Sequence, residues 1–170
     1  IGQAKTGTGK TLGFGLPMLT RLADGRRGTT RAVVLVPTRE LALQVADVLS
    51  PLAGTVGLSV VLVAGGMSYG PQTKAFDRGV DVVVATPGRL VDHFYRATMR
   101  FGEVKVLILD EVDRMLDMGF VDSISEIIEQ TPARPPARAA PSKTCPTATT
   151  SSTRPSCAAR CWRFWCSKPK

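Results

Sequence analysis

Residues 4–11 combine glycines, a lysine and a hydroxyl in an order that suits a phosphate group. The segment reads AKTGTGKT and stands between a short apolar stretch and a helical pattern. Its glycines let the backbone curl until successive N–H groups point at phosphate oxygens. Lys10 would then reach the β- and γ-phosphates, and Thr11 would offer its hydroxyl to Mg²⁺. The expected nucleotide-binding residues are Ala4, Lys5, Thr6, Gly7, Thr8, Gly9, Lys10 and Thr11, with Ala4 at the first glycine of the G-x-x-x-x-G-K-[ST] pattern.

Three carboxylates later in the chain supply the complementary chemistry. The stretch LILDEVDR runs an apolar segment straight into Asp110, Glu111 and Asp113. Carboxylates are costly to bury without a partner, so these acids are expected to face a cation or a ligand. Asp110 would bind the Mg²⁺ that Thr11 also holds, and Glu111 would orient and deprotonate an attacking water. Lys10 and Glu111 are the expected catalytic residues. Taken singly, a flexible glycine turn and a solvated acidic turn are the alternatives.

The elements that must position these residues follow an alternating pattern. Four β-branched runs are expected to be strands, at residues 31–37, 58–64, 80–85 and 104–109. Continuous apolar runs predict strands that are buried on both faces, as in a parallel sheet. Helical periods lie between them, so we expect an α/β fold with a mostly parallel sheet and helices on both faces. Such sheets bind ligands at the carboxyl ends of their strands, where Asp110 and Glu111 would lie.

Helices are expected after Lys10, over residues 38–53, after Gly88 and near Ser123. The second of these has apolar residues at helical spacing, at Leu41, Val45, Val48, Leu49 and Leu52. Ser123 and Glu126 fit a capping box, which predicts a helix start at Ser123. His93 is expected on the surface of the third helix, and we give it no role.

The net charge of +8 belongs to the end of the chain. Residues 1–130 hold 14 Lys or Arg and 14 Asp or Glu, whereas residues 131–170 hold 8 basic and no acidic residues. The excess is therefore no evidence for a nucleic-acid face on the body of the chain. The tail also holds all 4 cysteines, whose spacing does not fit common zinc sites, and its Pro-rich and Ser-rich composition favours disorder. Out-of-frame translation, a natural solvated tail and an RNA-binding arm are three open interpretations.

Five motifs occur in a fixed order: AKTGTGKT at 4–11, PTRELALQ at 37–44, GG at 65–66, TPGR at 86–89 and LDEVDRMLDMGF at 109–120. This succession resembles the first half of the DEAD-box ATP-dependent RNA helicases. The resemblance implies a RecA-like P-loop NTPase fold, with ATP and Mg²⁺ as cofactors and RNA-stimulated ATP hydrolysis as the activity. It also divides the chain into an N-terminal RecA-like ATP-binding domain at 1–131 and a disordered basic tail at 132–170.

The resemblance further implies contacts with the sugar-phosphate backbone of RNA, with little sequence preference. Each of the loops follows a predicted strand, where free N–H groups and an arginine can grip phosphates without reading bases. The expected RNA-contacting residues are Pro37, Thr38, Arg39, Glu40, Gly65, Gly66, Thr86, Pro87, Gly88 and Arg89. Purely structural roles are the alternative for single residues, with Thr38 as a helix cap and Arg89 as an ion-pair partner.

The chain departs from the family pattern at three places. The glutamine segment that reads adenine would precede Ile1, and Val112 replaces the usual alanine. No Ser-Ala-Thr strand follows Pro132, although Asp113 is expected to couple the ATP site to RNA through it. A second RecA-like domain with an arginine finger is also missing, and such an arginine contributes roughly 10³ to 10⁵ in rate. We therefore expect this chain alone to bind Mg-ATP and RNA weakly and not to unwind duplexes.

Two other activities stay open: a module that only binds nucleotide, and a DNA-directed helicase of the same superfamily. No apolar run approaches the ~20 residues of a membrane helix, so no membrane contact is expected. A chain without a signal peptide and without cysteine in its body suits a cytoplasmic, reducing compartment. We expect a monomer.

Overall fold

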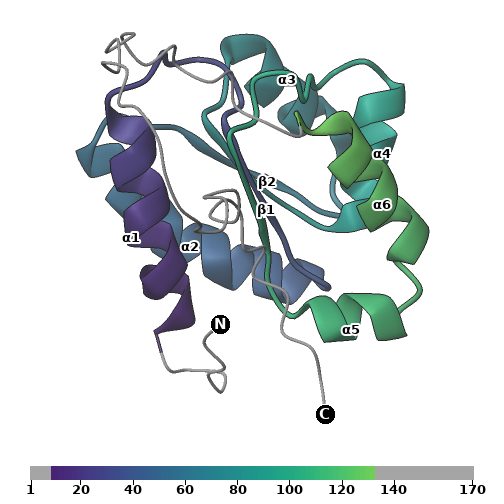
Figure 1. The fold of residues 1–170 in the computed structure, drawn as a ribbon. Helices are drawn as coiled ribbons and strands as arrows, with labels where there is room; N and C mark the ends of the chain where they lie inside the picture. The colour runs from purple at the N-terminus through teal and green to yellow at the C-terminus, as the bar shows by residue number, and fades with distance from the viewer. Residues whose placement is uncertain (1–8, 133–170) are drawn as a thin grey trace, which may run out of the picture.

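The computed structural model describes residues 9–132 of the chain. Its helices are α1 (Lys10–Ala23), α2 (Arg39–Thr55), α3 (Tyr69–Arg78), α4 (Pro87–Tyr95), α5 (Val112–Asp117) and α6 (Val121–Gln130). Its strands are β1 (Ala32–Leu35), β2 (Val60–Val63), β3 (Val82–Ala85) and β4 (Val106–Leu109). The strands are parallel in the order β2-β3-β1-β4 (Figure 1). The expected parallel α/β fold is confirmed, and residues 1–8 and 133–170, with nearly all of the predicted tail, lie outside the described residues.

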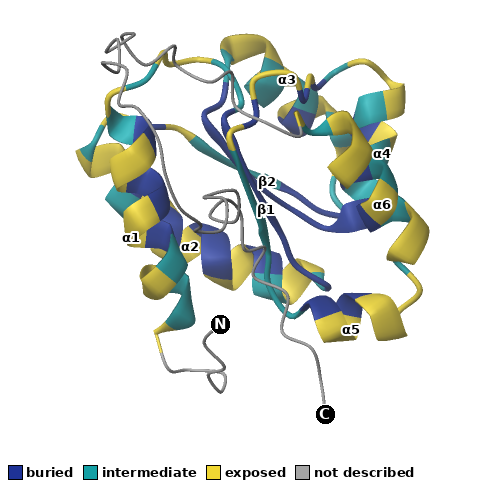
Figure 2. Cartoon of the chain, viewed as in Figure 1, coloured by how far each residue is buried: buried dark blue, intermediate teal, exposed yellow. Residues whose placement is uncertain are grey.

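Alternation along the strands divides the core into two layers. Val34 and Val84 face the side covered by α1 and α2, where they pack with Leu22 and Leu49. Val33, Leu35 and Val83 face the opposite side, where they join buried side chains of α4, α5 and α6. Figure 2 shows the central strands and the inward faces of these helices as buried and the outer faces of the helices as exposed. Because successive side chains point to opposite faces, two apolar layers form from one continuous apolar run.

The position of each strand in the sheet sets its burial. Every residue of the central strands β1 and β3 is buried. Within residues 9–132, β2 and β4 are the edge strands, and β4 is only half-buried along its whole length. The prediction that all the strands are buried on both faces is therefore wrong for the two edges, because an edge strand lacks a neighbour on one side.

The register aligns the carboxyl ends of all four strands. Leu35 pairs with Ala85 and with Leu109, and Ala85 pairs with Val63. The pairing continues one residue further, since the Thr86 N–H donates to the Val63 carbonyl at 3.0 Å and the Asp110 N–H donates to the Leu35 carbonyl at 2.9 Å. Four predicted site segments therefore leave the sheet at the same level.

Two of the helix predictions are wrong, the start of the last helix at Ser123 and the place of Val48 on the buried face of α2. Helix α6 begins at Val121, and Ser123 lies inside it without capping it, because Phe120 is the residue at the cap position. In α2, Val48 is 37% exposed, and Ala42, Ala46 and Ala53 line the buried face together with Val45 and Leu49. Small alanines suit this face because α1 packs closely against α2 in the same core layer.

Two helices were not predicted, α3 and α5. Helix α3 is polar, with Pro71 in its first turn and Gly79 just past its end at φ 87. Proline near the start and glycine after the end are typical of a helix. The helix was not predicted because its apolar period is weak. Helix α5 has six residues and begins within the acidic motif itself, at Val112.

A closed ion pair ties the opposite, amino ends of the strands together. The Asp81 carboxylate lies 2.9 Å from the Arg31 guanidinium, and both residues are almost fully buried. Asp81 also accepts hydrogen bonds from the N–H and hydroxyl of Ser59, at 3.0 and 2.9 Å. Arg31 donates in addition to the Leu22 carbonyl at 2.7 Å. A counterion and several hydrogen bonds make a buried charge tolerable, although Nε of Arg31 has no partner within the described residues, so this cluster joins β1, β3 and α1 as a structural element.

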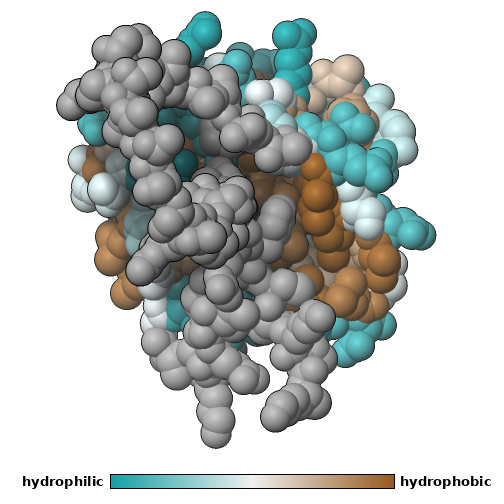
Figure 3. All heavy atoms as spheres, in the orientation of Figure 1, coloured by the Kyte–Doolittle hydropathy of each residue, from teal (hydrophilic) through white to brown (hydrophobic). Residues whose placement is uncertain are grey.

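Exposed apolar side chains gather near α5 and α6. Leu116, Met118 and Val121 are each about half exposed, at 47%, 49% and 49%. Figure 3 shows apolar side chains on this face between more hydrophilic ones. None of the helices within residues 9–132 is long and apolar enough to span a bilayer.

Candidate active site at the carboxyl ends of the strands

Lys10, the lysine of the AKTGTGKT motif, lies in the first turn of α1. Gly9 precedes the helix in the left-handed region, at φ 75 and ψ 18, which glycine adopts without strain. Lys10 and Thr11 are both half-buried. The first turn contains no acidic residue, so its N–H groups and positive dipole end suit an anion. Ala4, Lys5, Thr6, Gly7 and Thr8 lie outside the described residues, and their nucleotide contacts stay predictions.

Asp110 is a carboxylate without an ion-pair partner within residues 9–132. Burial raises the pKa of Asp110, and the negative charges of Glu111 and Asp113 raise it further. The Lys10 ammonium acts in the opposite direction and lowers this pKa, so Lys10 and Asp110 interact across the space between α1 and β4. The charges of these two residues therefore influence each other, although the residues lie far apart in the sequence.

Glu111 adopts a strained backbone conformation at the end of β4. Its φ of 52 and ψ of 48 lie in the left-handed region, which is unfavourable for a side chain other than glycine or asparagine. Its carboxylate is 3.5 Å from the guanidinium of Arg114, an exposed residue. Strain of this kind costs of order 1–3 kcal/mol and persists where the surroundings require it, often at functional sites. Asp113 follows in the first turn of α5 and is exposed.

Oxygen atoms of Asp110 and Thr11 suit a hard divalent cation. Within residues 9–132 no group of three or more His, Cys, Asp or Glu residues could hold a metal by itself. Mg²⁺ commonly binds through one or two protein oxygens together with substrate phosphates and water. The raised pKa of Asp110 also indicates a carboxylate that a cation would stabilise in its charged form. The residues present therefore fit a phosphate-bound Mg²⁺.

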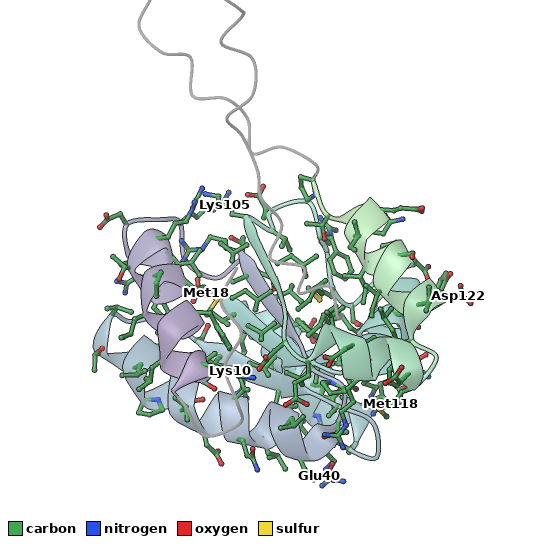
Figure 4. The ribbon with its side chains drawn as sticks, turned by 60° about the horizontal axis from the view of Figure 1, so that its bottom comes forward. Lys10, Met18, Glu40, Lys105, Met118 and Asp122 are labelled. Atoms are coloured by element: carbon green, nitrogen blue, oxygen red, sulfur yellow. The ribbon has the colours of Figure 1, made fainter. Side chains whose placement is uncertain are left out.

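Figure 4 shows Lys10, Glu40 and Met118 toward one end of the domain and Lys105 at the other end. Glu40 stands in the first turn of α2, directly after β1. Met118 follows α5, and Lys105 precedes β4. The start of α1, the acidic motif and the start of α2 thus share one end of the sheet, which is the end expected for ligands.

The second and third motifs meet beside α2. Thr38 caps this helix, with its hydroxyl accepting from the Leu41 N–H at 3.3 Å, so the structural role considered for it is confirmed. A Cβ atom added at Gly66 would lie 3.3 Å from Nη1 of Arg39, which places the Arg39 guanidinium against the Gly65-Gly66 loop. Arg39, Gly66 and Gln72 also line a cavity of about 400 Å³. Pro37 is buried, whereas Arg39, Glu40, Gly65 and Gly66 are exposed.

Arg89 of the TPGR motif is held by several partners. Its Nε donates to Oε1 of Gln72 at 3.3 Å, and its Nη2 donates to the Met67 carbonyl. Its guanidinium lies 3.3 Å from the centre of the Tyr69 ring. Within residues 9–132 it forms no ion pair with a carboxylate, so the alternative role suggested for it is wrong. Thr86 and Pro87 are buried, and Gly88 is half-buried beneath Phe120.

The prediction that His93 lies on the surface is wrong. His93 is fully buried, and its ring packs against Tyr69 and Phe76. Its Nε2 is 2.8 Å from Oε1 of Gln72, and its Nδ1 is 2.8 Å from the Thr98 hydroxyl. Helix α3 supplies three of these four neighbours, so the contacts of His93 could not be predicted without that helix.

A family model for DEAD/DEAH box helicases matches residues 1–157. The chain belongs to the DEAD/DEAH box helicase family. The chain is 50% identical over 140 residues to the DEAD-box ATP-dependent RNA helicase 3B, chloroplastic, of Zea mays, covering 78% of this chain and 19% of that protein. It is 47% identical over 133 residues to the ATP-dependent RNA helicase DeaD of Mycobacterium tuberculosis, covering 78% and 23%.

Solved structures of this helicase family have the same fold. A hypothetical ATP-dependent RNA helicase from Sulfolobus tokodaii superposes with a TM-score of 0.67 at 39% identity, covering 75% of this chain and 36% of the other. The yeast DEAD-box splicing factor Prp28 superposes with a TM-score of 0.69 at 32% identity, covering 75% and 31%. The DEAD/DEAH box chain described here therefore has a RecA-like domain fold, and it spans about a fifth of the length of the curated relatives it matches.

Proposed function

We propose that this chain is the ATP-binding part of an ATP-dependent RNA helicase. Residues 4–11 would hold the triphosphate, and Thr11 and Asp110 would hold its Mg²⁺. The observation that supports this most strongly is the placement of Lys10 at the start of α1 and of Asp110 directly after β4, where the Lys10 charge lowers the pKa of Asp110. A cationic side chain facing an unpaired carboxylate is the arrangement that a metal-bound phosphate needs.

Each residue of this site has a distinct task. Lys10 binds and orients the terminal phosphates, while the first-turn N–H groups of α1 donate to their oxygens. Bound Mg²⁺ would neutralise charge on the phosphates and polarise them. Glu111, which follows Asp110 at the end of β4, is proposed to accept a proton from the attacking water. Asp113, exposed at the start of α5, is proposed to couple the ATP site to RNA.

The RNA backbone is proposed to bind along the ends of β1, β2 and β3. Arg39 and Gly66 are exposed and lie against each other, which supports a shared phosphate contact. Arginine and backbone N–H groups bind phosphates without reading bases, so we propose little sequence preference.

Duplex unwinding is proposed for the whole protein, since the relatives are about five times as long as the matched segment. A cytoplasmic location is proposed because residues 1–130 contain no cysteine, as is usual in a reducing compartment.

Nucleotide binding tests the ATP site directly. A fluorescent ATP analogue would be titrated in the presence of Mg²⁺ into the full chain, Lys10→Ala and Lys105→Ala. Lys105 is a matched control, because it is an exposed lysine at the opposite end of β4 (Figure 4). We expect Lys10→Ala to weaken binding at least about tenfold, or about 1.4 kcal/mol, and Lys105→Ala to leave it unchanged. Equal affinities for Lys10→Ala and the unmodified chain would remove the proposal.

RNA dependence separates the helicase from the other two activities. ATP turnover would be measured with no nucleic acid, with single-stranded RNA and with DNA of the same sequence. Stimulation by RNA alone supports the proposal, because the 2′-hydroxyl is the feature that distinguishes the two strands. Equal stimulation by DNA would favour a DNA-directed helicase. Nucleotide binding without stimulation by either strand would favour a module that only binds nucleotide.

A further inference from the structure

The buried side chain of Gln72 joins three segments at the proposed RNA-binding edge. Gln72 is 3% exposed, and its amide uses both of its ends. Its Nε2 donates to the Ala64 carbonyl at 3.5 Å, just before the Gly65-Gly66 loop. Its Oε1 accepts from Nε of Arg89 at 3.3 Å and lies 2.8 Å from Nε2 of His93. One polar side chain therefore links the end of β2 to two successive turns of α4.

The partners of Gln72 determine the orientation of its amide and the tautomer of His93. A guanidinium can only donate and a carbonyl can only accept, so Oε1 must face Arg89 and Nε2 must face Ala64. His93 must then donate from its Nε2 to Oε1 of Gln72. The Thr98 hydroxyl lies 2.8 Å from Nδ1 and 2.9 Å from the His93 carbonyl, and its single proton can be donated to only one of them at a time. A neutral imidazole with its proton on Nε2 is consistent with burial lowering the pKa of His93.

The same network holds the Gly65-Gly66 loop at both of its ends. Gln72 binds the Ala64 carbonyl before Gly65, and Arg89 binds the Met67 carbonyl after Gly66. Gly66 itself has a φ of 72, a conformation that other residues rarely adopt. Fixing both ends of such a loop lowers the ordering cost when a ligand binds to it. Arg89 is in turn held flat against Tyr69, and within residues 9–132 its Nη1 forms no hydrogen bond.

We infer that Gln72 and His93 are positioning residues that hold Arg89 and the Gly65–Met67 loop as a single RNA-gripping unit. This inference rests on the proposed RNA binding and adds two residues to it. His93 orients the Gln72 amide through its Nε2. The oriented amide then holds Nε of Arg89 and the Ala64 carbonyl at the start of the loop. Held in this way, Arg89 can donate from Nη1 to a phosphate oxygen. A residue that only filled the core would need none of these polar contacts.

RNA affinity as a function of salt tests the unit in the full 170-residue chain. Each phosphate contact adds about 0.7 to the slope of log affinity against log salt for a single strand. We expect Gln72→Leu to lose about tenfold in RNA affinity and about 0.7 in slope, as Arg89→Ala does. Affinity for the Mg-bound ATP analogue should stay unchanged in both variants, which shows that they are folded. In the Arg89→Ala background, Gln72→Leu should cause no further loss.

A wild-type salt slope in a folded Gln72→Leu variant would overturn the inference, as would additive losses in the double variant. If Gln72→Leu fails to bind the ATP analogue, a pair at His93 decides. His93→Gln retains a side-chain N–H donor, and His93→Phe retains the aromatic ring without one. Loss of slope in His93→Phe with recovery in His93→Gln supports the inference, and a wild-type slope in His93→Phe contradicts it.

Backbone NMR relaxation of the free chain separates this inference from the proposed function. The order parameters of the Gly65, Gly66 and Met67 N–H groups should fall from about 0.85 to about 0.6 or lower in Gln72→Leu. Unchanged order parameters overturn the positioning role, even if RNA binds. Lower order parameters in a chain that binds no RNA leave the loop restraint correct and remove the RNA function on which the unit depends.

Discussion

Asp81 and Asp110 are two carboxylates at opposite ends of the same sheet, and their surroundings differ sharply. Burial alone would raise the pKa of Asp81, but hydrogen bonds from Ser59 and Arg31 and the charge of Arg31 outweigh it and lower that pKa. Burial also raises the pKa of Asp110, and there the neighbouring acid Glu111 adds to the increase. The protein itself neutralises one of these carboxylates and leaves the other with a deficit of positive charge.

This difference separates a structural end of the sheet from a functional one. The Arg31–Asp81 pair is buried and fully enclosed by protein groups, so it has no capacity for a ligand. The Asp110 end combines a lysine, a strained glutamate and a carboxylate that has no ion-pair partner within residues 9–132, and a Mg-bound phosphate would supply the missing positive charge to Asp110 and a negative charge to Lys10. A charge that the fold does not compensate is a stronger indication of function than a charge that is merely buried.

The largest expected effect is a loss of stability when the closed pair is broken. Asp81→Ala would leave the Arg31 guanidinium buried without its counterion, and such changes cost about 3–5 kcal/mol. Urea unfolding followed by circular dichroism measures the free energy of unfolding. The double variant Arg31→Met, Asp81→Leu should recover much of the loss, because it removes both charges. A loss below about 1 kcal/mol for Asp81→Ala would contradict the structural role of this end.

The opposite end should respond to the same kind of substitution with a loss of function alone. Asp110→Asn is expected to weaken binding of the Mg-bound ATP analogue at least about tenfold, or about 1.4 kcal/mol. The free energy of unfolding should be unchanged or higher, because ionised Asp110 is unfavourable in the folded chain at neutral pH. Titration with the analogue and urea unfolding of one preparation measure both quantities. An Asp110→Asn variant that is less stable than the unmodified chain but binds the analogue with unchanged affinity would contradict the functional role of this end.

Glu111 allows strain and chemistry to be separated at the functional end. Glu111→Gly should raise the free energy of unfolding by about 1 kcal/mol, since relief of left-handed strain exceeds the added chain entropy of glycine. Glu111→Ala is the matched control, because it keeps the strain and also removes the carboxylate. Both variants should lose ATP turnover while they still bind nucleotide. Equal stabilities for the two variants would show that the backbone at this position is not strained.

The smallest expected effect is a pH dependence that arises from His93. Burial lowers the pKa of His93, and the charges of Arg89 and Arg96 lower it further against the opposing effect of Asp92. The folded pKa therefore lies below the ordinary value of 6.5 in the unfolded chain. Its contribution to stability is fully present above that pH and is lost as the pH falls through the folded pKa. Urea unfolding at a series of pH values should show this loss in the unmodified chain and not in His93→Gln.

Local patterns in the sequence were sufficient for much of the fold. The four β-branched runs became strands, and their alternation built both layers of the core. The nucleotide-binding roles of Lys10 and Asp110 stay predictions, and the lowering effect of the Lys10 charge on the Asp110 pKa agrees with them. Helix α3 was overlooked because it buries only Gln72, and a helix with a single buried residue has almost no apolar period.

The sequence by itself determined which segments form strands, where each strand ends and which residues carry charge at those ends. Only the tertiary structure decided which strands are central, which carboxylate finds a counterion and which polar side chains become buried. Arg31 meets Asp81 across fifty residues, and Gln72 meets His93 across twenty-one. Backbone periodicity acts over neighbouring residues, whereas charge compensation depends on which elements the packing brings together.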